Sequence, residues 1–66
     1  MQVVINGEPR QVLAPISLAQ AVALLTSAQA GIAAALNGDV VRRAAWKSTS
    51  LTDGDEVEVL TAVQGG

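Results

Sequence analysis

The chain has 66 residues, of which four are basic and six are acidic, so its formal net charge is −2. This length is enough for one small domain, and a domain this small buries only about 60% of the surface of its unfolded chain. The chain contains no cysteine and no histidine, which excludes disulfides, thiolate metal sites and the usual general base. With 50% hydrophobic residues, an aliphatic core has to supply the stability.

The sequence shows no signal for a membrane or for nucleic acid. Its longest apolar runs, 21–25 and 32–36, have about five residues, whereas a membrane-spanning helix needs about 20. The four basic residues form no basic patch of the kind that binds nucleic acid. Strand-like sequence begins at Met1 without a charged leader or a cleavage site. We therefore expect a cytoplasmic protein with no membrane and no nucleic-acid partner.

The first elements form a predicted hairpin. Residues 1–5 alternate between two faces, with Val4 on the face opposite Met1, Val3 and Ile5, which predicts a strand. Asn6-Gly7 is typical of a tight two-residue turn. A second strand is predicted over residues 10–13, and Pro15 ends it.

A helix is predicted next, over residues 18–27. Ser17 and Gln20 have the spacing of a capping box, in which the serine hydroxyl and the glutamine side chain each bond to a backbone amide of the other residue. Gly31 follows as a turn residue. One apolar stripe recurs at helical spacing and should face the core; it consists of Leu18, Ala21, Val22 and Leu25.

The second half of the chain predicts three strands. Residues 32–36 are apolar on both faces, which is typical of a strand buried centrally in a sheet. Asn37-Gly38 predicts a second hairpin turn that leads into a strand over residues 40–42. A looser segment, 43–52, contains Trp46, which we expect to pack in the core or at its rim.

The clearest strand in the sequence is 55–62, which follows an Asp53-Gly54 turn. Val57 and Val59 fall on one of its faces, and two glutamates fall on the other. Asp53 and Asp55 could suggest a metal or acid–base site, but aspartate beside glycine is ordinary turn chemistry, and we interpret both as turn residues.

The predicted order is strand, strand, helix, strand, strand, strand. It indicates an α+β fold in which one helix packs on one face of a mixed five-stranded sheet. We expect the domain to cover residues 1–62. Residues 63–66 should form a flexible tail, because nothing after Val63 can pack against the domain.

The same order of elements occurs in the β-grasp, or ubiquitin-like, fold, and the residues extend the resemblance. The second half of the chain resembles the ThiS family, the sulfur carrier proteins of bacterial thiamine biosynthesis, and the first half agrees in length, in its Met1-Gln2 start and in its hairpin–helix order. One departure is Arg42, where many relatives carry proline; it touches a strand end only. The resemblance rests on Ala35-Leu36-Asn37-Gly38-Asp39-Val40-Val41, Trp46, Asp53-Gly54-Asp55-Glu56-Val57-Glu58-Val59-Leu60 and Thr61-Ala62-Val63-Gln64-Gly65-Gly66.

The resemblance implies that the first and last strands lie side by side in the middle of the sheet. It also implies that Gly66 is adenylated by a ubiquitin-activating-type adenylyltransferase (ThiF-like), which uses ATP and magnesium. Sulfur from a donor protein then converts Gly66 to a thiocarboxylate, which supplies sulfur to the thiazole ring on a thiazole synthase (ThiG-like). The chain itself would bind no cofactor and no metal and would be a protein co-substrate, not an enzyme.

Other residues receive supporting roles. Val63, Gln64 and Gly65 would thread into partner sites, because glycine has no Cβ and an extended tail reaches beyond the domain surface. An apolar pair beside the tail and two glutamates on the same face could contact a partner. These expected partner-contact residues are Val4, Leu60, Ala62, Glu56 and Glu58.

Three alternatives remain open from the sequence. A carrier for molybdopterin synthesis or for tRNA thiolation would end in the same diglycine. A ubiquitin-like modifier would be conjugated to lysines of target proteins. A regulatory β-grasp module would have no covalent role, and its tail would be dispensable.

Overall fold

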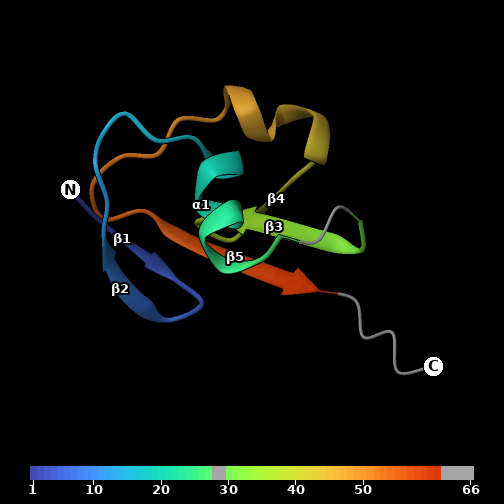
Figure 1. Cartoon of the computed structure of the whole chain (residues 1–66), viewed down its shortest axis with the longest axis horizontal. Helices are drawn as coiled ribbons and strands as arrows, with labels where there is room; N and C mark the ends of the chain where they lie inside the picture. Colours follow the sequence, from blue (N-terminus) through green and yellow to red (C-terminus); the bar gives the residue numbers. More distant parts are fainter. Residues whose placement is uncertain (28–29, 62–66) are drawn as a thin grey trace.

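The computed structural model describes residues 1–27 and 30–61. Over these residues one α-helix and one 3₁₀-helix lie on the same side of a five-stranded sheet, as Figure 1 shows. The elements are β1 (Gln2–Ile5), β2 (Glu8–Gln11), α1 (Leu18–Leu25), β3 (Ile32–Leu36), β4 (Asp39–Val41), the 3₁₀-helix η1 (Arg43–Ser48) and β5 (Glu56–Thr61).

The strand order is β2-β1-β5-β3-β4, which places β5 at the centre of the sheet. β1 runs parallel to β5, with Val4 opposite Glu56 and Ile5 opposite Val57. The other pairs, β1–β2, β3–β4 and β3–β5, are antiparallel. The mixed five-stranded sheet and the adjacency of its first and last strands are therefore confirmed.

The first hairpin is tighter than predicted. Asn6-Gly7 alone forms the turn, so Glu8 already pairs with Ile5 and β2 covers 8–11. The prediction of 10–13 was wrong, since β2 starts directly after the turn and includes Pro9. β2 is an edge strand, where a residue without a backbone N–H is tolerated.

The capping box of α1 is confirmed. The Ser17 hydroxyl accepts a hydrogen bond from the Gln20 backbone N–H at 3.1 Å, and the Gln20 side chain accepts one from the Ser17 N–H at 2.9 Å. The helix ends at Leu25, with Thr26 as its C-cap, two residues before the predicted end. Leu25 in this last turn is 37% exposed, whereas the rest of the predicted stripe is buried.

The apolar strand β3 is not buried on both faces. Ala34 points into the core, but Ala33 is exposed on the other face of the sheet. β3 lies between β5 and β4, so it is interior within the sheet plane while its outer face stays open. β4 begins one residue earlier than predicted, at Asp39, and η1 occupies part of the segment that was predicted to be irregular.

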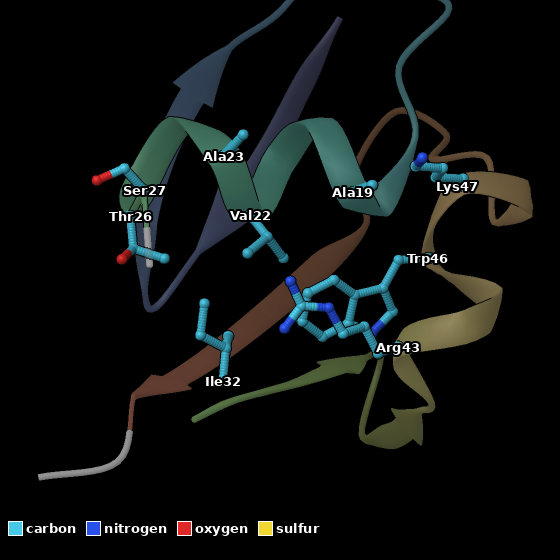
Figure 2. Close-up of a pocket in the computed structure, with 9 residues that line it drawn as sticks. All are labelled: Ala19, Val22, Ala23, Thr26, Ser27, Ile32, Arg43, Trp46 and Lys47. Atoms are coloured by element: carbon cyan, nitrogen blue, oxygen red, sulfur yellow. The ribbon is translucent and has the colours of Figure 1, made fainter. Parts of the chain in front are cut away.

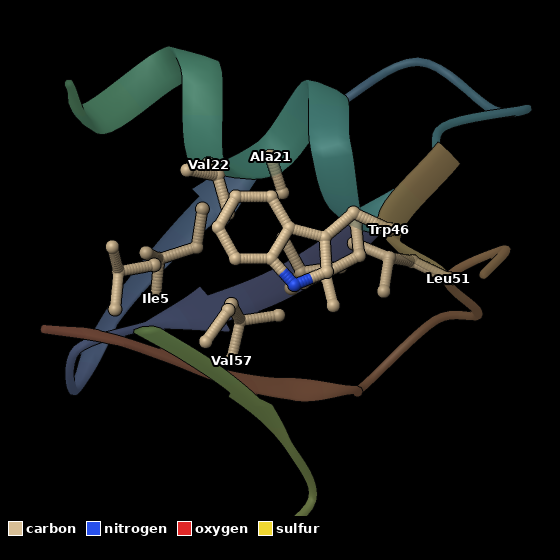
Figure 3. Close-up of a cluster of buried hydrophobic side chains, with 10 residues drawn as sticks. Ile5, Ala21, Val22, Trp46, Leu51 and Val57 are labelled. Atoms are coloured by element: carbon tan, nitrogen blue, oxygen red, sulfur yellow. The ribbon is translucent and has the colours of Figure 1, made fainter. Parts of the chain in front are cut away.

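The core lies between the sheet and the two helices (Figure 3). Trp46 is 5% exposed and its indole N–H donates to the Val41 carbonyl at 2.8 Å, which confirms it as a packing residue. Each fully buried aliphatic side chain contributes about 1.5–3 kcal/mol. Within the described ranges no helix is long and apolar enough to cross a membrane. The buried hydrophobic residues are Val3, Ile5, Leu18, Ala21, Val22, Ala34, Trp46, Leu51, Val57 and Val59.

Candidate functional site: the outer face of the sheet

The central strand β5 presents opposite chemistry on its two faces. Val57 and Val59 are buried under α1 at 1% and 5% exposure. Because side chains alternate along a strand, Glu56, Glu58 and Leu60 point away from the helices and are exposed. The predicted division of this strand into an inner and an outer face is confirmed.

Strand pairing brings further residues onto this outer face. Leu60 lies opposite Ala33, and Glu58 lies opposite Ala35. Ala35 in turn lies opposite Val40 of β4, and on the other side of β5 Glu56 lies opposite Val4. We call these residues together the outer patch: Val4, Ala33, Ala35, Val40, Glu56, Glu58 and Leu60.

The outer patch is hollowed where its side chains are small. A depression of about 240 Å³ is lined by side chains that include Ala33, Ala35, Val40 and Leu60. A second one, of about 360 Å³, lies on the other side of Leu60 and reaches Val4. The two alanines leave the space between Val40 and Leu60 open, so the surface can receive side chains from another molecule.

The outer patch combines exposed apolar side chains with two carboxylates. Val40 of β4 is 81% exposed and Leu60 of β5 is 67% exposed, and only the small alanines of β3 lie between these two large aliphatic residues. A contiguous exposed apolar surface of this kind marks an interaction site more often than scattered single residues do. Glu56 and Glu58 add negative charge, which favours approach by a basic surface.

Two asparagines bond to β5, the central strand of the outer patch. Asn6 accepts a hydrogen bond from the Val59 N–H at 2.8 Å and donates to the Val59 carbonyl at 3.1 Å. From the β3–β4 turn, the Asn37 side chain accepts from the Glu56 N–H at 2.9 Å, and its backbone N–H donates to the Glu56 carbonyl at 2.7 Å. Both hairpin turns thereby fix the position of β5.

The aspartates before β5 act as turn residues, as predicted. Asp53 accepts a hydrogen bond from the Gln2 N–H at 2.7 Å. Asp55 accepts from the Thr52 N–H at 2.8 Å and from the Asn37 side chain at 3.1 Å. These bonds, the one from the Thr52 backbone first, lower the pKa of Asp55 below its ordinary value because they stabilise the carboxylate. In 1–27 and 30–61 no cluster of three metal-ligating side chains occurs.

The structure brings together four of the five residues that were expected to contact a partner. Val4, Glu56, Glu58 and Leu60 share the outer face, although their role there stays a prediction. Ala62 and residues 63–66, with the modified Gly66 and the threading residues Val63, Gln64 and Gly65, lie outside the described residues. So does the boundary between domain and tail.

Sequence reasoning missed Val40, Ala33 and Ala35. The Asn37-Gly38 turn was the signal that could have found them. A two-residue turn pairs Leu36 with Asp39 and therefore Ala35 with Val40. Because the predicted strand began only at Val40 and residues 32–36 were taken as buried on both faces, the exposure of this pair was not foreseen.

Comparisons with known proteins agree with this architecture. The family model of the ThiS family matches residues 3–66. The sulfur carrier protein ThiS of Escherichia coli (strain K12) is 30% identical over 66 residues, which is 100% of this chain and 100% of that protein.

Two solved structures from Geobacter metallireducens are similar over the whole chain. The crystal structure of its thiamine biosynthesis protein ThiS has a TM-score of 0.80 and 35% identity, with 100% of both chains covered. The NMR solution structure of a thiamine biosynthesis protein has a TM-score of 0.82 and 35% identity, covering 100% of this chain and 88% of that one. The fold is thus the β-grasp that the sequence suggested, and the chain belongs to the ThiS family.

Proposed function

We propose that this protein carries sulfur for thiamine biosynthesis on the carboxylate of Gly66. The observation that carries the proposal is the match to the ThiS family, which continues through the diglycine to residue 66. The related protein of Escherichia coli is a sulfur carrier. On this proposal the chain is a co-substrate of partner enzymes and not an enzyme itself.

The proposed chemistry begins with activation of the carboxylate. A terminal carboxyl group has a pKa of about 3.3–3.7, so at neutral pH it is ionised and resists attack by a nucleophile. A ThiF-like adenylyltransferase joins the Gly66 carboxylate to the α-phosphate of ATP, with magnesium, and pyrophosphate leaves. A persulfide on a donor protein then displaces AMP and forms an acyl disulfide with Gly66. A thiol of a partner protein attacks the donor's sulfur in that acyl disulfide, so a disulfide forms between the two proteins' sulfurs and Gly66 leaves as a thiocarboxylate.

The sulfur has to come from another protein, because this chain contains no cysteine. The same absence means that no internal thiol can attack the adenylated glycine. The thiocarboxylate acts as the sulfur nucleophile that a ThiG-like thiazole synthase uses to build the thiazole ring. This route places adenylation and sulfur delivery on two different partners that receive the same glycine.

The extended length of residues 63–66 and the small size of the two glycines support threading of these residues into partner sites. Residues 63–66, if extended, span about 13–14 Å, which is enough to bring a carboxylate from the domain surface into a buried site. Gly65 and Gly66 have no Cβ, so they fit a narrow channel and adopt backbone angles closed to other residues. Gln64 and Val63 would line the channel entrance.

The outer patch is the surface we propose for docking these partners. Three of its seven residues belong to β5, the strand after which the chain continues into residues 62–66. Val4 and Leu60 supply apolar contact, and Glu56 and Glu58 supply charge that a basic partner surface would recognise. Ala62 would extend the contact toward the tail.

The test is the intact mass of the protein after incubation with ATP, magnesium, its cognate adenylyltransferase and a sulfur source. We expect a gain equal to the replacement of one oxygen by one sulfur, and no gain when Gly66 is deleted. Gly66→Ala should slow the reaction strongly and leave thermal unfolding unchanged. No gain with an adenylyltransferase that is active on another carrier would refute the proposal.

A further inference from the structure

A second recessed surface lies on the side of the sheet opposite the outer patch. It is a groove of about 330 Å³ between α1, η1 and the beginning of β3. Figure 2 shows Val22 next to the Trp46 ring and the Arg43 side chain lying across the ring on the side toward Ile32. Arg43, Trp46 and Lys47 all belong to η1. The groove therefore has an apolar floor and a basic rim.

The basic rim is built on a rigid support. The Arg43 guanidinium carbon lies 5.5 Å from the centre of the Trp46 ring, within the range of a cation–π contact. The ring itself is buried, and its N–H donates to the Val41 carbonyl at 2.8 Å. Stacking on a fixed ring holds Arg43 over the groove and leaves its N–H donors at the edge of the guanidinium plane free to pair with a carboxylate.

The groove is basic although the protein is acidic. Three of the four basic residues of the chain fall within 42–47, and two of them, Arg43 and Lys47, line the groove. Among the residues that the structure describes, no aspartate or glutamate lines it. Glu56 and Glu58 point to the other face of the sheet, so the two faces carry opposite charge.

We propose that this groove binds an acidic segment of a partner protein, with one aliphatic side chain on the apolar floor and neighbouring carboxylates on Arg43 and Lys47. The net charge of −2 disfavours a nucleic-acid strand, which needs a broad basic surface. Two cations beside an apolar floor match a short peptide in which acidic and aliphatic residues alternate. The proposal does not depend on the sulfur-carrier function.

This docking would leave the outer patch free. The groove lies on the helix side of the sheet and the outer patch on the opposite side, and they share none of their lining residues. One partner can hold the groove while another occupies the outer patch.

Trp46 makes the proposal testable because it is the only tryptophan and the chain has no tyrosine. Its indole is therefore the one intrinsic fluorophore of the protein, and it lines the groove. The probe is a synthetic peptide of alternating leucine and glutamate with blocked ends, compared with the same peptide carrying glutamine in place of glutamate. We expect a saturable change in emission with the glutamate peptide that weakens as salt screens the charges.

Variants of the two basic residues that line the groove test whether their own charges, and not the net charge of the protein, determine peptide binding. Lys47→Glu and Arg43→Ala should each weaken binding of the glutamate peptide about tenfold or more, equivalent to about 1.4 kcal/mol. Arg42→Ala is the matched control: it removes the same charge from the neighbouring residue, which does not line the groove, and should leave binding unchanged. Thermal unfolding checks that each variant is folded. Lys47→Glu is the variant whose stability should change least, because the Lys47 side chain is exposed.

Three results would overturn the proposal. The first is the absence of a saturable response to the glutamate peptide, or an equal response to the glutamine peptide. The second is an equal loss of binding in Arg42→Ala. The third is a saturable response to hexanoate without any response to the peptide, which would make the groove a site for a small anion.

Discussion

Two asparagines determine how the central strand is held. Asn6 and Asn37 both have positive φ, 51° and 50°, a conformation that asparagine tolerates better than most residues. Each is followed by a glycine that also has positive φ, as a two-residue hairpin turn requires. The side chains then bond to the backbone of β5 from the turns of its two neighbouring hairpins. A single residue thus closes a turn and also ties that turn to the middle of the sheet.

Substitutions at Asn6 separate these two tasks. Asn6→Gly keeps the backbone conformation but loses both side-chain hydrogen bonds to Val59, which should cost about 1–2 kcal/mol. Asn6→Ala loses the same bonds and adds about 1 kcal/mol or more for an L-residue with a Cβ at positive φ. Urea unfolding measures both variants. Equal stability of the glycine variant and the unmodified protein would show that the two bonds contribute nothing.

Among single residues, the sequence predicted those hydrogen bonds whose two partners are close together in the chain. Ser17 and Gln20 were assigned to a capping box that the structure confirms, since both partners lie within one turn. The bonds of Asn6 to Val59 could not be predicted because they span 53 residues. The exposure of Leu25 was missed because helical spacing alone does not indicate where a helix ends.

At the level of elements, the entry to β5 is fixed by a small polar network. The carboxylate of Asp55 accepts from Thr52, within its own turn, and from Asn37, in the β3–β4 turn. These contacts join the segment after η1 to a neighbouring hairpin at the point where β5 begins. The network consists of hydrogen bonds to an ionised group, which are stronger than those between neutral groups.

This network predicts a pH dependence of stability. Folding lowers the pKa of Asp55, so the unfolded chain binds the proton more tightly than the folded one. The carboxylate therefore stabilises the fold above its ordinary pKa, and this contribution is lost as the pH falls through the lower pKa of the folded state. Asp55→Asn should be less stable than the unmodified protein at neutral pH, and the difference should shrink in acid.

Chemical denaturation across the acidic range measures that difference. Asp39→Asn is the control, because it removes the same charge from an exposed residue of β4 and reports the effect of net charge alone. A constant difference between Asp55→Asn and the unmodified protein at every pH would contradict the prediction.

The elements themselves were predictable to different degrees. β5 and α1 were identified because each has a clear period and a strong turn or cap before it. β2 was predicted two residues too late; it contains Pro9, and a strand with proline is tolerated at the edge of a sheet, a position that the local sequence does not reveal. The helix η1 was not foreseen, since its single large apolar residue, Trp46, defines no period and is buried through contacts with α1 and β4.

For the whole molecule, the central fact is that its two faces differ. The helix side carries a basic groove, and the outer side of the sheet carries apolar residues with two glutamates. This difference was not visible in the sequence, where the few basic residues were weighed only as a nucleic-acid surface. The fold places Arg43 and Lys47 at the edge of one groove, with Arg43 over the Trp46 ring.

Leu60 tests the proposed role of the outer patch. Leu60→Glu places a charge at its apolar centre and should weaken binding to the cognate adenylyltransferase about tenfold or more. Stability should change by no more than about 0.5 kcal/mol, because Leu60 is 67% exposed. Calorimetric titration against the adenylyltransferase measures the affinity.

Leu13→Glu is the matched control for that experiment. Leu13 is 91% exposed and lies in the loop between β2 and α1, outside the outer patch, so its substitution makes the same change in charge. We expect it to bind the adenylyltransferase normally. An equal loss of affinity in both variants would mean that net charge, and not the outer patch, determines docking.

The central position of β5 also has a mechanical consequence. Hydrogen bonds run perpendicular to the strands in an antiparallel ladder and at a slant in a parallel one, and β5 is bonded to β3 by the first kind of ladder and to β1 by the second. A force applied along β5 from its Thr61 end therefore shears two ladders at once. A strand at the edge of the sheet, such as β2 or β4, has only one ladder to resist the same load. An enzyme that pulls on the residues after Thr61 would thus be pulling on an interior strand of the sheet.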